Sequence, residues 1–405
     1  PSANMAAMIP VFGAVLAKYG RYWRPSLADG MAIGLALVMG ISEYRAAGYN
    51  EAQNLVAGTV LQMVAPYLCA RLVVGREDLH VELARIFVLI LFSLALVGMF
   101  EFKFGWNPFL VYPQKLFFAG QGYGWVTTFR YGFARVAGPY AHCILAGMMM
   151  IMAYRLNRWL EWGGHWEEKF ARLPWLPVPK GRAITYALIL GSVTTIARGP
   201  WIGGILGALL VNVGRHPRRK KLFPSLFATL VFVAIPAKVA FDSYLSVKPG
   251  MKLTDSQITA MYRKELFEKY YDIALDHAWL GWGRNTWPKV NGMVSVDNYY
   301  LLLSLMHGLV ATGLFVTLML WMSVRLFRRG MAEPEGYNSL AFTMMAIIIA
   351  IAVSVATVYL GENVVPALFL ILGWAETYLQ DRRLIGQVGN FPTAPTGFSF
   401  RHVIR

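Results

Sequence analysis

Residues 299–323 read YYLLLSLMHGLVATGLFVTLMLWMS and contain no Asp, Glu, Lys or Arg. A helix needs about 20 apolar residues to cross the hydrocarbon core of a bilayer, so this stretch predicts a transmembrane span. Similar apolar runs occupy residues 4–17, 30–42, 54–71, 84–101, 136–154, 183–197, 201–214, 222–241, 339–360 and 362–379. We therefore predict an all-α, polytopic membrane protein with about eleven spans.

The composition of the whole chain agrees with this prediction. Of its 405 residues, 57% are hydrophobic and 15% are charged, and the mean hydropathy is +0.46. Soluble domains carry about 25% charged residues, so a soluble globular protein is excluded. Only short charged stretches separate the apolar runs, which indicates a single transmembrane domain over residues 1–405 rather than several soluble domains.

The net charge of +16, from 38 Lys and Arg against 22 Asp and Glu, reflects topology. Basic residues gather near 18–24, 71–85, 155–182, 215–221 and 325–329, and again after the last run. The positive-inside rule places these loops and the C-terminus in the cytoplasm, so no nucleic-acid partner is expected. Eleven spans would leave Pro1 outside, and we expect one further span before it and twelve in the full protein. The runs 30–42, 183–197 and 201–214 are short, which predicts tilted, broken or half-crossing helices.

Two long segments are then extracytoplasmic, and we expect both to cover the active-site cavity. The first, about 102–135, is aromatic and rich in Gly, which suits a loop at the membrane interface. The second, about 242–298, predicts an amphipathic helix over the outer mouth of the bundle, starting near Thr254. Its apolar face would hold Ile258, Met261, Tyr262, Leu266, Tyr270 and Ile273.

Arg198, in the stretch TTIARGPWIGG, is the most informative arginine of the outer face. It joins two apolar runs with almost no loop, and a cation at that depth usually marks a substrate path, a charge partner or a snorkelling side chain. Gly199 and Pro200 would break the helix and bring backbone N–H groups toward an anion. The structural alternative is an ion pair with Glu362 or Asp242.

Other outer arginines suggest the same chemistry. Arg130 and Arg135 precede a span that begins with Gly138 and Pro139, and they would bind an anion or lipid headgroups. Arg263 lies on the predicted amphipathic helix, where neighbouring acids are alternative partners. Several guanidinium groups meeting in one cavity would suit a pyrophosphate without a metal ion.

No cofactor is expected, and no metal. The sequence has no HExxH, Asp-x-Asp or CxxC motif, and its two cysteines, Cys69 and Cys143, fall in or beside apolar runs. P-loop and GxGxxG signatures are also missing, so nothing in the sequence supports ATP use.

The candidate general base is Asp297, at the outer end of the run 299–323. The alternative for a carboxylate at that place is an ordinary N-cap, and Asn298 could share either role. Glu362 is the reserve candidate, as base or as partner of an arginine. His307 is expected to be a packed or paired histidine.

Four segments in order carry a resemblance to a known group of proteins. They are RVAGPYAHCILAG (135–147), ARGPWIGG (197–204), HAWLGWG (277–283) and DNYYLLLSLMHGLVATG (297–313). Together they resemble the superfamily of bacterial O-antigen polymerases and O-antigen ligases, the Wzy-type and WaaL-type membrane glycosyltransferases.

The resemblance implies a GT-C-like bundle of about twelve spans in the bacterial plasma (inner) membrane, with the active site facing the periplasm or exterior. It implies a glycan donor carried on undecaprenyl pyrophosphate, metal-independent transfer with inversion, and a lipid-linked glycan or lipid A-core as acceptor. Carried over by position, Arg198 and Arg263 would hold the pyrophosphate, Arg135 would lie at the cavity edge, and Asp297 would orient or deprotonate the acceptor hydroxyl.

The ligases of this group have His at the position of Asp297, whereas many polymerases have Asp followed by Asn. We therefore favour a polymerase of O-antigen or exopolysaccharide repeat units, with a chain-length regulator as a further partner. An O-antigen ligase is the alternative. A transporter of lipid-linked sugars is a third reading, against which the clustering of charges at the outer face argues.

Overall fold

The computed structural model describes residues 3–116, 126–170, 175, 177–245, 253–293 and 295–381, and these residues are mostly helical. The N-terminal helices are α1 (Ala3–Tyr19), α2 (Leu27–Ala47), α3 (Tyr49–Thr59), α4 (Ala65–Val73), α5 (His80–Phe104) and α6 (Pro108–Leu116). The others are α7 (Cys143–Trp162), α8 (Lys180–Thr194), α9 (Arg198–Arg215), α10 (Arg219–Leu245), α11 (Asp255–Asp276), α12 (Tyr299–Ala332), α13 (Leu340–Val355) and α14 (Val365–Gln380). A short 3-10 helix, η1 (Gly20–Tyr22), follows α1, and a π-helical turn, η2 (Val60–Val64), joins α3 to α4.

Each apolar run predicted from the sequence overlaps one of these helices or the continuous run α3–η2–α4, although the run 136–154 begins seven residues before α7 and the run 339–360 ends five residues after α13. Among the described residues, five helical segments are long and apolar enough to cross a membrane: Leu27–Ala47, Tyr49–Val73, His80–Phe104, Arg219–Leu245 and Tyr299–Ala332. An all-α, multi-pass membrane protein is therefore confirmed, while the number of spans stays a prediction.

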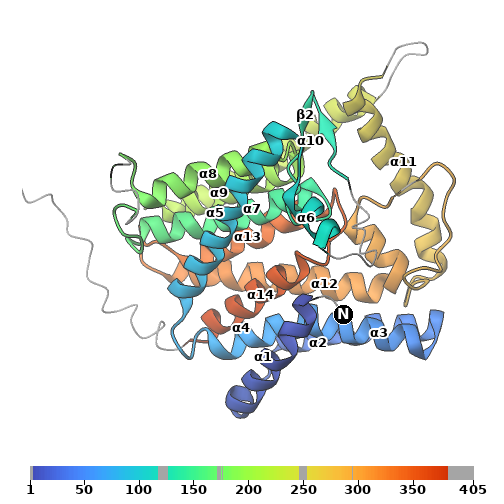
Figure 1. Ribbon diagram of the computed structural model, residues 1–405, viewed down its shortest axis with the longest axis horizontal. Coiled ribbons are helices and arrows are strands. Elements are labelled where there is room, and N and C mark those ends of the chain that lie inside the picture. Colours follow the sequence, from blue (N-terminus) through green and yellow to red (C-terminus); the bar gives the residue numbers. More distant parts are fainter. Residues whose placement is uncertain are drawn as a thin grey trace, which may run out of the picture.

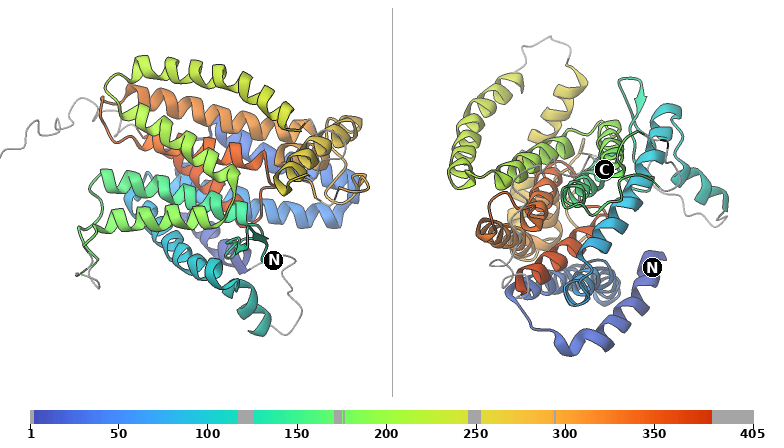
Figure 2. Two further views of the ribbon diagram at one scale, coloured as in Figure 1. Left: turned by 90° about the horizontal axis from the view of Figure 1, so that it is seen from above. Right: turned by 90° about the vertical axis from the view of Figure 1, so that its left-hand side faces the viewer.

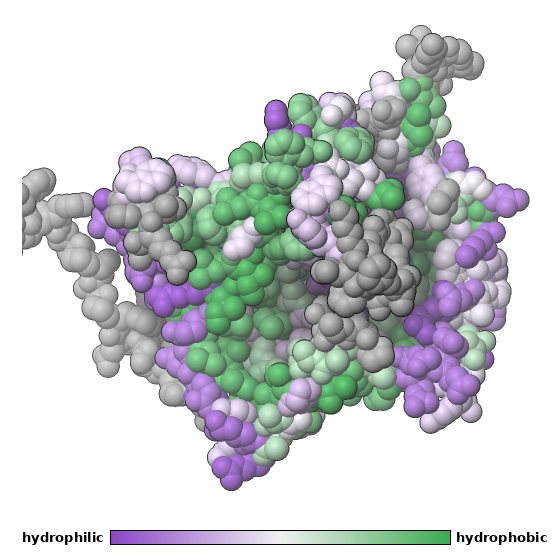
Figure 3. Space-filling view, in the orientation of Figure 1, coloured by the Kyte–Doolittle hydropathy of each residue, from purple (hydrophilic) through white to green (hydrophobic). Residues whose placement is uncertain are grey.

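The helices form one bundle with α13 near its centre (Figures 1 and 2). Almost every side chain of α13 is buried, against α7, α9 and α12 above all. In contrast, α10 runs along the outside and exposes large apolar side chains, with Phe232 80% exposed. Figure 3 shows apolar residues over the middle of the molecule and hydrophilic residues toward the helix ends, as a protein in a bilayer requires.

Helix α9 packs on α13 with almost no side chain between the two backbones. A Cβ atom built on Gly203 would lie 2.6 Å from the carbonyl oxygen of Ala350, and one on Gly207 would lie 3.1 Å from that of Ala346. Small residues at a four-residue spacing let helices in a membrane approach closely. The position of α9 is thus fixed along its length by α13.

Helix α12 is broken at Gly308, whose φ of 79° and ψ of 177° are not helical. The segment 277–283 fits into this break: the Trp282 N–H donates to Leu305 O at 2.8 Å, and the Gly283 N–H donates to Met306 O at 2.8 Å. A Cβ atom on Gly308 would lie 2.2 Å from Trp279 O, so only glycine fits. We expected a possible break in 30–42, but α2 is continuous from Leu27 to Ala47.

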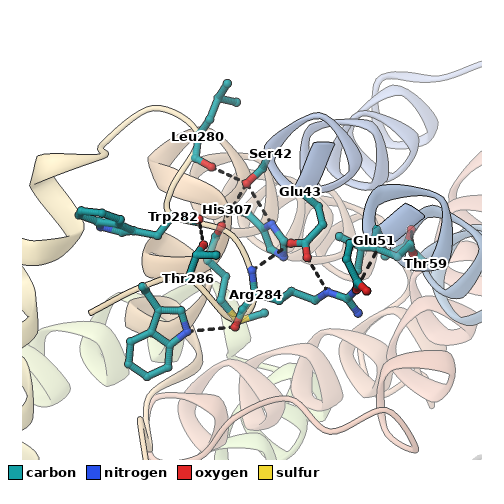
Figure 4. A network of polar contacts seen from close by, with 12 residues as sticks. Ser42, Glu43, Glu51, Thr59, Leu280, Trp282, Arg284, Thr286 and His307 are labelled. Atoms are coloured by element: carbon teal, nitrogen blue, oxygen red, sulfur yellow. Dashed lines mark hydrogen bonds and ion pairs between the residues drawn. The ribbon is translucent and has the colours of Figure 1, made fainter. Parts of the chain in front are cut away.

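A polar network ties the broken helix to α2 (Figure 4). Ser42 donates to Leu280 O and lies 3.3 Å from Nδ1 of His307, which is fully buried, as expected for a packed histidine. Nearby, Arg284 forms ion pairs with Glu43 at 3.2 Å and with Glu51 at 3.1 Å. This network fixes the segment 277–287 against the bundle.

Both segments predicted as outer loops contain regular structure. Within 102–135 lie α6 and a two-stranded hairpin, β1 (Phe129–Arg130) and β2 (Phe133–Ala134), in which Arg130 pairs with Phe133. The prediction of a simple interfacial loop therefore missed this helix and hairpin, because such short elements leave little periodic signal in a sequence. Residues 117–125 of the predicted loop lie outside the described residues.

Within 242–298, α11 begins directly after Thr254, whose side chain caps it together with Gln257 in a reciprocal capping box. The helix buries Leu266 and Tyr270 against the start of α12 and exposes Ile258, which we had expected on the same apolar face. That it covers an outer mouth of the bundle stays a prediction.

Candidate active site

Residues from five separate segments meet at one end of the bundle. The segments are the hairpin and the loop after it (129–142), the α8–α9 connection (195–198), α11, the start of α12 and the α13–α14 connection (356–364). Hydrogen bonds join several of them: Arg135 to Thr195 and Ile196, Arg263 to Thr357, and Asn363 to Pro139.

The α8–α9 connection is a strained turn. Ile196 has a φ of 47°, and a β-branched residue in this left-handed region is a true outlier that costs about 1–3 kcal/mol. Arg135 lies against this turn, with Nε 3.3 Å from Thr195 O and Nη2 3.3 Å from Ile196 O. The charged guanidinium therefore holds the two carbonyl groups that the unusual backbone turns toward it.

Arg198 is the first residue of α9 and comes directly after the strained turn. Its side chain is exposed, and its Nη2 lies 3.4 Å from the hydroxyl of Tyr131 in the hairpin. Ala197 at the N-cap offers no side-chain hydrogen bond, so the N–H groups of the first turn and the positive end of the helix dipole lie beside this guanidinium. The arrangement favours an anion at this place.

Arg263 approaches the same place from α11. Its Nη2 donates to Thr357 O at 3.3 Å, and its Nε is buried with no hydrogen-bond partner among the described residues. Burial lowers the pKa of Arg263, the carboxylate of Asp297 raises it, and the charges of three further arginines lower it again. These are Arg130, Arg198 and Arg135.

The other three arginines predicted from the sequence therefore lie within electrostatic reach of Arg263. Two carboxylates share the region: Asp297, and Glu362 on the α13–α14 connection, whose charges both raise the pKa of the half-buried Tyr359. Glu362 is exposed, and the other acid considered as a partner of Arg198, Asp242, is paired with Lys238 at 2.8 Å. The site as described carries an excess of positive charge, which a bound anion would balance.

Asp297 does not cap α12. The N-cap is Asn298, whose Oδ1 accepts a hydrogen bond from the Leu301 N–H at 3.2 Å. Asp297 instead accepts a hydrogen bond from the Ser295 hydroxyl at 2.8 Å and lies partly exposed. The N-cap alternative for Asp297 is thus wrong, and its carboxylate remains available on the side of Arg263.

His142 is a member of this cluster that the sequence analysis missed. It precedes the first residue of α7, and its Nδ1 accepts a hydrogen bond from the Ile144 N–H at 3.1 Å. Burial lowers the pKa of His142 to about 4, Arg135 and Arg263 also lower it, and Asp297 raises it. The ring is therefore neutral at pH 7, and because Nδ1 accepts, Nε2 carries the proton. The signal that the sequence offered was its place in RVAGPYAHCILAG (135–147), the first of the four segments that carry the resemblance.

Within the described residues, no group of three or more His, Cys, Asp or Glu side chains is placed to hold a metal ion. The side chains that gather at this end of the bundle are guanidinium groups, hydroxyl groups, one imidazole and two carboxylates. Such a set can hold phosphate oxygens and can accept a proton from a hydroxyl group.

A comparison with protein families agrees with this chemistry. The model of the family described as O-antigen ligase matches residues 183–316, a segment that contains Arg198, Arg263 and Asp297. A search of curated proteins found no match to the chain. The resemblance to the superfamily of O-antigen polymerases and ligases is therefore confirmed for this segment, whereas Arg130 and Arg135 lie before it.

Proposed function

We propose that the chain, whose residues 183–316 match the O-antigen ligase family, is a membrane glycosyltransferase that uses an undecaprenyl-pyrophosphate-linked glycan as donor. The observation that carries this proposal is the meeting of four arginines with the carboxylate of Asp297 at one end of the bundle. A lipid pyrophosphate is an anion with a long apolar tail, and it requires a cationic site at the edge of an apolar bundle. The basic loops lie at the opposite helix ends, so we assign this site to the outer, periplasmic face of the plasma membrane.

In the proposed site, Arg198 and Arg263 hold the pyrophosphate oxygens, and Arg130 adds to the positive potential. The bond between the anomeric carbon and the pyrophosphate oxygen breaks, and the leaving pyrophosphate takes the electron pair. Fixed positive charge aimed at that developing charge lowers the barrier, which is the contribution that a metal ion makes in other transferases.

Asp297 accepts the proton of the acceptor hydroxyl as its oxygen bonds to the anomeric carbon from the opposite side, so the configuration inverts. The carboxylate is suited to this role because Asn298 caps the helix in its place and because only the Ser295 hydroxyl donates to it within the described residues. Glu362 is the reserve base on the same end of the bundle.

We favour a polymerase that adds the donor glycan to the next lipid-linked repeat unit, since Asp and not His precedes Asn298. The second candidate is an O-antigen ligase with lipid A-core as acceptor. The description of the matching family favours this candidate, and both activities use the same donor site.

The test uses purified protein in detergent with EDTA and an undecaprenyl-pyrophosphate oligosaccharide as the only substrate, with products resolved by length on a gel. A ladder of repeats supports the polymerase. A single transfer product that forms only when lipid A-core is added supports the ligase and overturns the polymerase.

Single variants test the site in the same assay. We expect Arg198→Ala, Arg263→Ala and Asp297→Ala to abolish transfer, and the matched control Arg218→Ala, an exposed arginine in the α9–α10 turn, to keep it. Wild-type transfer by Arg198→Ala in a folded protein would overturn the proposed donor site.

A further inference from the structure

A basic cavity lies at the end of the bundle opposite the candidate active site. Helix α14 starts after the α13–α14 connection of the candidate active site and ends at this cavity, so the two sites are separated by the length of a helix. The cavity has a volume of about 750 Å³ and lies between the α1–α2 connection, the end of α4 and the end of α14. None of its residues takes part in the candidate active site.

Four arginines line the cavity: Arg21, Arg24, Arg71 and Arg76. Arg71 is only 8% exposed and forms part of the wall, because it pairs with the buried Asp29 at 3.5 Å and donates to Arg24 O and to the side chain of Gln380. Its position is therefore fixed by the fold and does not depend on a ligand.

The other three arginines are exposed, and two of them share one aromatic ring. The guanidinium carbon of Arg76 lies 3.9 Å from the ring centre of Tyr22, and that of Arg21 lies 4.6 Å from it. Among the described residues, no ion pair with a carboxylate is found for Arg21, Arg24 or Arg76. A cation–π contact holds such groups in place without neutralising them. Asp381 also lines the cavity and Asp29 pairs with Arg71, so four arginines face two carboxylates and an excess of positive charge remains.

The place of the cavity indicates what it binds. It lies at the ends of membrane helices, beside Tyr22 and Trp23, and such aromatic side chains are enriched where hydrocarbon meets headgroups. Basic pockets between helices at this level bind the phosphate groups of anionic lipids. The volume of about 750 Å³ exceeds that of a single phosphate ion and leaves room for a larger headgroup.

We propose that this cavity binds the phosphodiester headgroup of an anionic phospholipid from the leaflet opposite the candidate active site. The headgroup phosphate lies among Arg21, Arg24 and Arg76, and Arg71 closes the inner wall. The acyl chains run along the apolar surface of the bundle.

The probe is phosphatidylglycerol titrated into delipidated protein in neutral detergent, with bound lipid counted by native mass spectrometry. We expect saturable binding to the wild-type protein and none of phosphatidylcholine with the same acyl chains. Each arginine near an anionic headgroup is worth about a fivefold factor, so Arg24→Gln should weaken binding about fivefold and the triple variant R21A/R24A/R76A about a hundredfold.

The matched control is the triple variant R218A/K220A/K221A, which removes three positive charges from the α9–α10 turn and the start of α10, outside the cavity. It should bind the lipid within about twofold of wild type. Equal weakening in both triple variants would show a response to net charge and overturn the site. If the cavity triple variant does not fold, Arg24→Gln decides, because Arg24 accepts the hydrogen bond of Arg71 with its backbone carbonyl group, which the substitution keeps.

Inorganic phosphate and glycerol phosphate distinguish a soluble ligand from a lipid. If either compound competes at millimolar concentration and the protein shows no preference for phosphatidylglycerol over phosphatidylcholine, the cavity binds a free phosphate compound. That result would overturn the proposal of a lipid ligand. Absence of any retained phosphatidylglycerol on the wild-type protein would also overturn it.

Discussion

Asp297 and Asn298 are neighbours in the chain, but the structure gives them different roles. Asn298→Ala removes the oxygen that accepts the Leu301 N–H at 3.2 Å, and loss of an N-cap costs about 1 kcal/mol of folding free energy. Asp297→Asn leaves that cap in place and removes the negative charge beside Arg263. If Asp297 is the base, transfer should fall by about 10²–10⁴, equivalent to about 3–5 kcal/mol in the barrier.

Two measurements separate these effects. Thermal unfolding in detergent should show a lower midpoint for Asn298→Ala and a midpoint near that of wild type for Asp297→Asn. Initial rates of ladder formation, taken well below both midpoints, should show the reverse pattern. Asn298→Ser is the matched control, because serine caps a helix as well as asparagine does and should restore the midpoint.

The reasoning fails if Asn298→Ala and Asn298→Ser both abolish transfer in a folded protein, since Asn298 would then contact the substrate. It fails also if Asp297→Asn transfers at the wild-type rate. In that case the base is elsewhere, and loss of activity in Glu362→Gln would identify it.

Three further predictions concern the turn before α9, the break in α12 and the imidazole of the site. Arg135→Ala should slow transfer, and adding Ile196→Gly should recover part of the rate, because glycine adopts the left-handed turn without strain; a direct role of Arg135 on pyrophosphate predicts no recovery. Gly308→Ala should lower the unfolding midpoint far more than Gly292→Ala, since both have positive φ but nothing lies within 4 Å of the second position, and equal shifts would contradict the contact. The pKa of His142 is about 4 in the folded protein and about 6.5 when unfolded, so its contribution to the free energy of unfolding is complete above pH 6.5 and is lost as the pH falls toward 4. His142→Gln should make the unfolding midpoint less dependent on pH between 6.5 and 4. An unchanged profile would refute the assignment of this pH dependence to His142.

Local patterns in the sequence account for much of the fold. Apolar runs located the long helices because burial in lipid imposes a length and a composition that each segment must meet alone. Thr254 marked the start of α11 because a helix N-terminus depends on a few consecutive residues, and the structure adds Gln257 as its partner in a capping box. The outer arginines could be recognised since the positive-inside rule gives them no other reason to be there.

Features that need two distant segments could not be predicted in this way. The break at Gly308 depends on the segment 277–283, which supplies new hydrogen-bond partners for the opened turn. The left-handed backbone conformation of Ile196 is held by the guanidinium of Arg135, which lies 61 positions away in the sequence. His142 became a site residue only when the fold brought it near Arg135 and Arg263.

The contact between α9 and α13 sets a length at the proposed donor site. Arg198 starts α9, and Thr357, whose carbonyl group accepts a hydrogen bond from Arg263, follows the end of α13. Because the two helix backbones are in direct contact, the distance between the start of α9 and the end of α13 is fixed. If Arg198 and Arg263 hold a pyrophosphate as proposed, this fixed spacing would let the site select its donor by the separation of the two phosphate groups as well as by charge. A lipid with one phosphate would contact only one of these two arginines and should compete poorly with the pyrophosphate donor.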